Sequence, residues 1–260
     1  MIAATIYENL KENRTKPKNH RFQKKIVSFW EKSWKENGFD TVVVTEKDFP
    51  VSSDFKNFCH RMEEVNRKIY GDSFERMKKG FMWRYSISCW KRWFIFAELN
   101  INEPFYCGDY DVINNSLTPD NCEISQDLFF LHGLCPCWAS GTSAQFKDFC
   151  DIAIKISEKN IDRISEFFKE KAISSFYTDQ SFFVCNHKDD DYKQSLINTS
   201  SSTIFLNGIR LDPECKLIHF SHNFTSRNCD KYSDSNRIKI IKKFMNEKES
   251  LNRNVSWRLG

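Results

Sequence analysis

The chain has 260 residues, 40% of them hydrophobic and 28% charged, which is typical of a globular protein and excludes a disordered one. This length allows one large domain or two small ones, with enough residues to bury a substantial core. The formal net charge is only +4, and acidic residues are interspersed with the basic ones, so most charges are expected to be solvated. Nothing in this composition indicates a nucleic-acid partner.

The N-terminus shows no targeting signal, because charged residues begin at Glu8 and leave no apolar run of signal-peptide length. No segment approaches the roughly 20 apolar residues that a membrane span needs. We therefore predict a cytoplasmic protein without a membrane span. Its ten cysteines are then expected to be mostly free and buried, with Cys135 and Cys137 flanking a turn rather than forming a metal or redox pair.

The N-terminal part of the chain predicts a strand, a helix and a second strand. Residues 2–6 form a short β-leaning run, and residues 41–45 are all β-branched, as in a buried parallel strand. Between them, apolar side chains recur at helical spacing over residues 20–37, and Gly38 follows as a helix end. This order is typical of a βαβ unit with a right-handed crossover.

Two further helices lead towards the next strand. Residues 55–69 carry one apolar stripe, with a cap among residues 52–54. Residues 81–99 are apolar almost all round, which predicts a deeply buried helix. Within it, Arg84 is a candidate phosphate partner, since a guanidinium matches phosphate oxygens bidentately, or else the member of an ordinary ion pair.

The second half of the chain shows a less regular α+β pattern. A strand-like run at residues 127–134 is interrupted by residues 135–138, and Gly141 with Thr142 then caps a helix. The remaining predicted elements are helices at 143–156, 161–168 and 237–247, strands at 203–206 and 216–220, and a polar loop at 188–202.

A pair of carboxylates follows the strand predicted at residues 104–107. Gly108 permits a sharp turn or a close approach to a ligand, and Asp109 and Asp111 share a face if the chain stays extended. Both carboxylates then reach one hard divalent cation, which prefers oxygen ligands. In open α/β sheets, ligands bind beyond the carboxyl ends of the strands, as here. The alternative is an ordinary surface turn, because this motif is short and common.

Other polar groups are candidates to join the two aspartates. His219 ends a short strand and suits a metal ligand or proton carrier, although it could bond to backbone or form a zinc site with His222 and Cys215. Asp179 and Gln180 lie between aromatic stretches. Such an acid-amide pair suits a site that hydrogen-bonds sugar hydroxyls, and it equally suits a helix N-cap.

Taken together and in their order along the chain, these motifs resemble those of glycosyltransferases of the GT-A fold. The resemblance covers roughly residues 1–225 and is carried by residues 106–113, 179–180 and 218–220. It implies that Mn²⁺ or Mg²⁺ is held by Asp109, Asp111 and His219, with Asp109 able to bind the donor ribose instead.

The resemblance also implies a donor site. Asp179 and Gln180 would hold the transferred sugar or the acceptor, and Asp179 would be the catalytic carboxylate. Close relatives follow the His-aromatic pair with a Gly and a Lys-Pro-Trp run that grips the phosphates, whereas this chain has other residues at 221–227. The nucleotide-sugar-binding residues implied are Thr5, Tyr7, Arg84, Asp109, Tyr110 and Asp111, with His222 or Arg227 in place of the phosphate-binding lysine.

The leading hypothesis is thus a single GT-A-like domain over residues 1–260, with a Rossmann-type mixed α/β sheet flanked by helices. Residues 1–115 would form the nucleotide-binding half, and residues 116–260 the acceptor-binding half with a C-terminal helix. The donor would be a UDP- or GDP-sugar, and the acceptor a glycan or a lipid-linked or protein-linked group. The alternatives are a metal-dependent phosphoesterase or nuclease, and a catalytically silent protein that binds sugar nucleotides.

Overall fold

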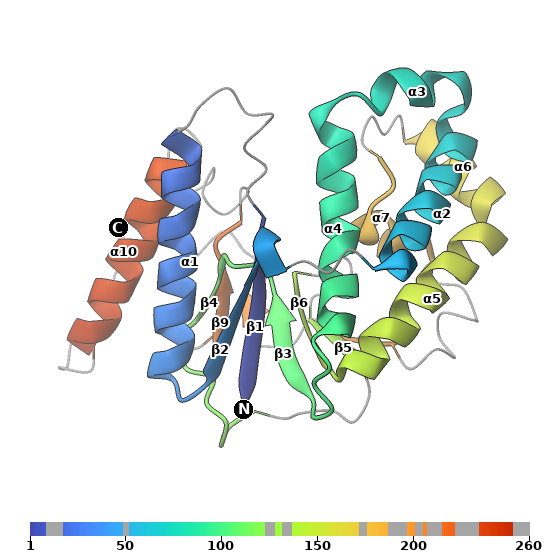
Figure 1. Ribbon diagram of the computed structural model, residues 1–260. Helices are drawn as coiled ribbons and strands as arrows, with labels where there is room; N and C mark the ends of the chain where they lie inside the picture. The colour runs from blue at the N-terminus through green and yellow to red at the C-terminus, as the bar shows by residue number, and fades with distance from the viewer. Residues whose placement is uncertain are drawn as a thin grey trace.

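A mixed sheet with helices on both faces forms the centre of the molecule (Figure 1). This arrangement confirms the α/β class that the sequence predicts. In the described part of the chain, no helix is long and apolar enough to cross a membrane. The computed structural model describes residues 1–8, 18–48, 52–122, 128–131, 137–171, 176–186, 197–200, 205–206, 215–221 and 234–251.

The first three strands form a parallel group at one edge of the sheet, whose full order is β2-β1-β3-β6-β5-β7. β1 (Ile2–Tyr7) lies between β2 (Asp40–Thr45) and β3 (Phe105–Gly108), and α1 (Lys18–Glu36) connects β1 to β2. The predicted βαβ unit is therefore confirmed. Because the chain moves from β1 to one side and later returns to the other, the strand order reverses between β1 and β3. Open α/β sheets bind ligands at the carboxyl ends of strands where such a reversal occurs.

The other half of the sheet differs from the sequence prediction. β5 (Leu128–Leu131) lies within the strand predicted at residues 127–134. No strand was predicted at β6 (Trp138–Gly141), which is antiparallel to both β3 and β5. Its last three residues, Ala139, Ser140 and Gly141, have little intrinsic β propensity, so pairing with two neighbouring strands is what holds β6 extended. β7 (Ile197–Ser200) pairs with β5 inside the region predicted as a polar loop, so that prediction was also wrong.

Side chains of the sheet alternate between two hydrophobic cores. In β3, Phe105 and Cys107 pack against the helices of one face, whereas Tyr106 packs against those of the other. The first face is covered by α2 (Ser53–Tyr70), α4 (Phe81–Glu98), α5 (Ser143–Lys159), α6 (Ile161–Glu170) and α7 (Asp179–Asn186), and the second by α1 and α10 (Asp234–Leu251) (Figure 1).

Local capping signals define several helix ends. Ser52 is the cap of α2, since its hydroxyl accepts from the Phe55 N–H at 3.1 Å. Thr142 and Gln145 form a capping box at the start of α5. The short elements η2 (Glu46–Asp48), η3 (Gly71–Ser73) and α3 (Phe74–Met77) complete the described helices.

A second, three-stranded sheet lies beyond β3, with the order β4-β9-β8. β4 (Val112–Asn114) follows β3 directly and pairs antiparallel with β9 (Leu217–His219), so that Val112 lies opposite His219. β8 (Phe205–Leu206) pairs parallel with β9. This small sheet brings a late part of the chain beside the carboxyl end of β3.

Candidate metal centre

The two aspartates after β3 are brought together by a turn. The Val112 N–H donates to the Asp109 carbonyl at 3.1 Å, and the Asp109 N–H donates to the Cys137 carbonyl at 2.9 Å. The expectation of an extended chain with both carboxylates on one face was therefore wrong about the backbone. The turn separates β3 from β4, and Asp109 and Asp111 converge through it.

Gly108 is required by the neighbouring strand rather than by a ligand. A Cβ atom at this position would collide with the Cys137 carbonyl and the Trp138 indole of the β6 region. The Thr5 hydroxyl donates to the Gly108 carbonyl at 2.7 Å and is fully buried. Thr5 thus links β1 to the end of β3, and its nucleotide contact, which the resemblance implies, stays a prediction.

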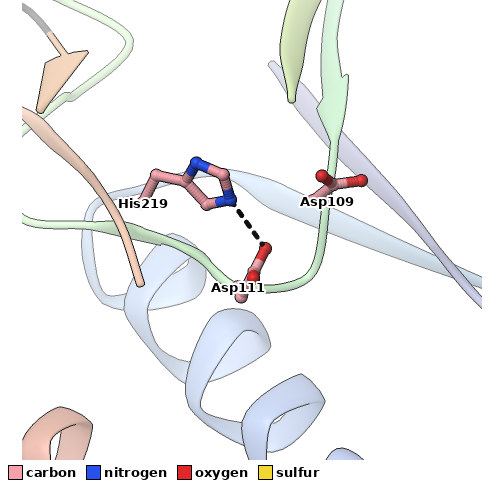
Figure 2. A group of neighbouring side chains, drawn as sticks. All are labelled: Asp109, Asp111 and His219. Atoms are coloured by element: carbon pink, nitrogen blue, oxygen red, sulfur yellow. Dashed lines mark ion pairs between the residues drawn. The ribbon is translucent and has the colours of Figure 1, made fainter. Parts of the chain in front are cut away.

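His219 reaches the aspartate pair from β9 (Figure 2). Its Nε2 lies 3.4 Å from Asp111 Oδ1, and one ligand atom each of Asp109, Asp111 and His219 lie within 4.8 Å of one another. The Phe220 N–H donates to the Asp111 carbonyl at 2.9 Å, which fixes the two segments together. Side-chain exposure is 38% for Asp109 but only 11% for Asp111 and 7% for His219, so the group opens to solvent on the Asp109 side.

The donor set fits a small divalent cation. Two ligand atoms, each about 2.1 Å from one ion, lie about 3 to 3.5 Å apart, which matches the separation of Asp111 and His219. Carboxylates suit Mg²⁺ and Mn²⁺, and imidazole is a common ligand of transition metals. Among the described residues, Asp109, Asp111 and His219 are the acidic, histidine or cysteine side chains whose ligand atoms all lie within 4.8 Å of one another. Cys215 does not belong to this group.

Arg237 of α10 occupies the other oxygen of Asp111. Its Nη2 donates to Asp111 Oδ2, and its Nε donates to the Phe220 carbonyl at 2.5 Å. Burial lowers the pKa of this guanidinium, against the opposing effect of Tyr110 and Asp109. From the sequence, this segment was predicted only as a helix at residues 237–247. The missed signal is that Arg237 lies on the buried stripe of Ile241 and Phe244, one and two turns away.

Arg92 of α4 holds Asp109 from the opposite side of the sheet. One nitrogen of its guanidinium donates to Asp109, and Nη2 and Nε donate to Asp179 Oδ2 at 2.5 and 3.1 Å. Burial alone would lower the pKa of Arg92, but the two carboxylates raise it well above its usual value. From the sequence, Arg84 was the candidate phosphate partner on this helix, and its side chain is exposed on α4.

Asp179 is only 2% exposed and is surrounded by protein donors. Besides Arg92, the Trp93 Nε1–H donates to its carboxylate at 2.7 Å, and the Gln180 N–H at 2.8 Å. It begins α7, as the helix-cap alternative predicted, and the Phe182 N–H bonds to the Thr178 carbonyl at 2.9 Å. These contacts suit a residue that positions Arg92 better than one that accepts a proton from an acceptor. Gln180 beside it is exposed.

Three carboxylates face two guanidiniums across this network. Asp109, Asp111 and Asp179 carry one more charge than Arg92 and Arg237 neutralise. An excess of negative charge in a partly buried cluster favours a bound cation. The network therefore retains the electrostatic character of a metal site although both aspartates already have arginine partners.

Other predicted donor residues lie around this centre. The rings of Tyr7 and Tyr110 make an edge-to-face contact with centroids 6.1 Å apart, so both are close to the ends of β1 and β3. Glu8, which was not singled out, follows β1 and accepts from Ser88 at 2.6 Å and from Lys91 at 3.1 Å. His222 and Arg227 lie outside the described residues, as does Cys135. The eight described cysteines are free, and four of them, including Cys137, are buried.

No family model matches the chain, and no curated protein matches it. The function must therefore be inferred from the geometry of the site.

Proposed function

We propose that this protein is a metal-dependent glycosyltransferase of the GT-A fold, which moves a sugar from a nucleotide-diphosphate sugar to an acceptor. The observation that carries the proposal is the convergence of Asp109, Asp111 and His219 at the carboxyl end of β3. The resemblance in sequence concerns the same three residues. The resemblance predicted that a histidine from a late strand lies beside Asp109 and Asp111, and the three residues are neighbours in the fold.

The position of the centre supports a nucleotide ligand. It lies at the carboxyl end of β3, beside β1, where the strand order reverses. Doubly wound α/β sheets bind nucleotides at such a reversal. Tyr7 and Tyr110 lie at the same edge, and their proximity supports a contact of this edge with a base or ribose. These features support the GT-A assignment within the broader α/β class.

The chain's own residues would have distinct roles. Asp111 and His219 are the inner ligands of a Mn²⁺ or Mg²⁺ ion, and the more exposed Asp109 completes the site or binds the donor ribose. When bound, the ion neutralises charge on the diphosphate that leaves. Arg92 holds Asp109 in place, and Asp179 in turn orients Arg92. Arg237 binds the second oxygen of Asp111, so the first oxygen, which lies 3.4 Å from His219 Nε2, would be the one that binds the ion.

A phosphoesterase with one or two metal ions would need further ligands beside this group, and Asp179 and His222 are the candidates in the sequence. Asp179 is instead bound to Arg92 and Trp93, and His222 lies outside the described residues. A group of three side chains that could hold one ion, at the carboxyl end of β3, supports the transferase better. A silent nucleotide-binding protein would have the same site, so only turnover separates these two functions.

The test is turnover of a panel of UDP- and GDP-sugars with Mn²⁺ or Mg²⁺, measured as release of nucleoside diphosphate, with water or added glycans as acceptor. We expect one donor to be consumed only when the metal ion is present. Asp109→Asn should abolish this release, whereas Asp40→Asn, which changes an exposed aspartate, should not. Cleavage of a simple phosphodiester without any donor turnover would favour the phosphoesterase instead.

A further inference from the structure

One side of α4 is turned towards the carboxyl ends of β1 and β3. Arg92 of this helix donates to Asp109, which follows β3. Ser88, one turn earlier, donates to Glu8, which follows β1, at 2.6 Å. The helix continues past these strand ends towards its N-terminus (Figure 1). Residues that precede Ser88 on this side of α4 therefore lie on the solvent side of the strand ends.

Tyr85 is such a residue. It precedes Ser88 by three residues and Arg92 by seven, so the three side chains share one side of the helix. Tyr85 is 44% exposed, whereas most aromatic rings of the described residues are buried. A single exposed ring is ordinary on a protein surface, and it is the surroundings of Tyr85 that indicate a role.

The phenol group of Tyr85 lies among the charged groups of the candidate centre. Cys89, partial burial and the charge of Asp109 raise the pKa of Tyr85, and Asp179 adds to this effect. Burial lowers the pKa of Arg237, and Tyr85 is among the groups that oppose this effect. The Tyr85 hydroxyl also hydrogen-bonds to Cys89, one turn further along α4, which restricts the orientation of the ring. Tyr85 is thus an oriented aromatic ring beside the aspartates.

The surroundings of this ring suit a saccharide. A sugar has apolar C–H faces, which stack on an aromatic ring, and hydroxyl groups, which donate to carboxylates and amides. Asp109 is 38% exposed at the end of β3, and Gln180 is exposed at the start of α7. A lipid tail would need further apolar surface, but the other exposed large apolar side chain of the described residues is Met1, at the opposite end of β1. One ring among polar groups therefore favours a saccharide over a lipid.

We propose that Tyr85 is a stacking platform for a sugar ring of the acceptor, so that the acceptor is a glycan. The role as acceptor rests on the proposed transferase function, whereas the binding of a saccharide rests on the position and exposure of Tyr85. The sugar lies with its apolar face on Tyr85 and with its hydroxyls towards the polar groups at the ends of β3 and α7.

The test is binding of the full chain to an array of neutral oligosaccharides, with Mn²⁺ and UDP or GDP present, followed by titration of the oligosaccharide that binds best. Tyr85→Ala should weaken this binding about tenfold, which is the upper range of an aromatic contact. Tyr85→Phe should retain the affinity, since the ring makes the contact and the hydroxyl does not. The matched control is Phe167→Ala, which removes a half-buried ring on α6 and should also retain it.

Three outcomes would overturn the proposal. These are no oligosaccharide bound by the wild-type chain, equal affinity of the wild-type chain and Tyr85→Ala, and a loss of UDP or GDP affinity in Tyr85→Ala, which would assign the ring to the nucleobase. Tyr85→Leu keeps apolar volume without the ring, so it should show the same loss and replaces Tyr85→Ala if that variant fails to fold. Saccharide binding that depends on Tyr85, without turnover of any nucleotide sugar, would contradict the transferase function and leave the saccharide platform in place.

Discussion

The two helical layers each place one arginine against the aspartate pair, and the two arginines are held differently. Arg92, from α4, lies between the carboxylates of Asp109 and Asp179. Arg237, from α10, binds the carboxylate of Asp111 and the carbonyl of Phe220. One guanidinium is thus shared by two anions, and the other has a single anion and a neutral acceptor.

This difference separates two roles within one network. On the α4 side, the two negative charges of Asp109 and Asp179 exceed the single positive charge of Arg92. Arg92 is therefore firmly bound and fixes the position of Asp109. On the α10 side, the positive charge of Arg237 balances the negative charge of Asp111, and Arg237 competes with a cation for this carboxylate. We therefore expect changes on the α4 side to affect mainly folding stability, and changes on the α10 side to affect mainly the affinity for metal.

The largest expected effect is on the α4 side. Asp179→Ala should lower the free energy of unfolding by about 3–5 kcal/mol, because it removes a buried partner of Arg92 and Trp93. Asp109→Ala should cost no more than about 1 kcal/mol, since Arg92 keeps Asp179 and the Asp109 side chain is partly solvated. Urea unfolding measures both, and equal losses would contradict the assignment of a structural role to Asp179.

The next largest effect is expected for the imidazole of His219. His219→Ala should weaken Mn²⁺ binding by about 10- to 100-fold, taking the range for lost metal-site interactions as a minimum. The control is His60→Ala, which changes an exposed histidine paired with Glu64 on α2. Isothermal titration with Mn²⁺ measures both variants, and an unchanged titration for His219→Ala would remove this residue from the site.

A smaller change of opposite sign is expected on the α10 side. Arg237→Met should raise the affinity for Mn²⁺ about tenfold, equivalent to about 1.4 kcal/mol, because a competing positive charge next to Asp111 disappears. The variant should be less stable than the wild-type chain without Mn²⁺ and regain stability when the ion is added. Lys239→Met on the exposed side of α10 should leave the titration unchanged. Weaker Mn²⁺ binding by the Arg237 variant would mean that this arginine supports the site instead of competing.

The smallest effect is expected for an arginine pair at the surface. Arg61 on α2 binds Glu158 on α5 through two hydrogen bonds of 3.0 and 2.6 Å, but both side chains are partly exposed. Glu158→Gln should therefore lower the free energy of unfolding by less than about 1 kcal/mol. A loss comparable to that of Asp179→Ala would show that burial does not distinguish the arginine pairs of this protein.

The sequence predicted those parts of the fold that local periodicity determines. The strands β1 and β2 follow from continuous β-leaning runs, and the helices α1, α2 and α4 follow from helical apolar patterns and from residues such as Ser52 and Gly38. β6 and β7 were missed because their residues are held extended by pairing with neighbouring strands. Such pairing depends on contacts between distant segments and leaves little trace in a short run of residues.

The residues of the candidate site divide in the same way, into those that the sequence predicted and those that it did not. Asp109, Asp111 and His219 were predicted because each follows or ends a recognisable strand, where side chains meet at one edge of a sheet. Arg92 and Arg237 were missed because their positions depend on how a helix is rotated against the sheet. Sequence spacing gives the buried side of a helix, but it does not give the carboxylate that this side will face.

The central claim is that Asp109, Asp111 and His219 form a metal-dependent nucleotide site, and thermal unfolding with UDP and GDP, with and without Mn²⁺, tests it most directly. We predict stabilisation that needs both one nucleotide and Mn²⁺, by about 2.7 kcal/mol at 100 times the dissociation constant, and that is lost in Asp109→Asn. No stabilisation by either nucleotide in the presence of Mn²⁺, or the same stabilisation without the metal, would contradict the claim.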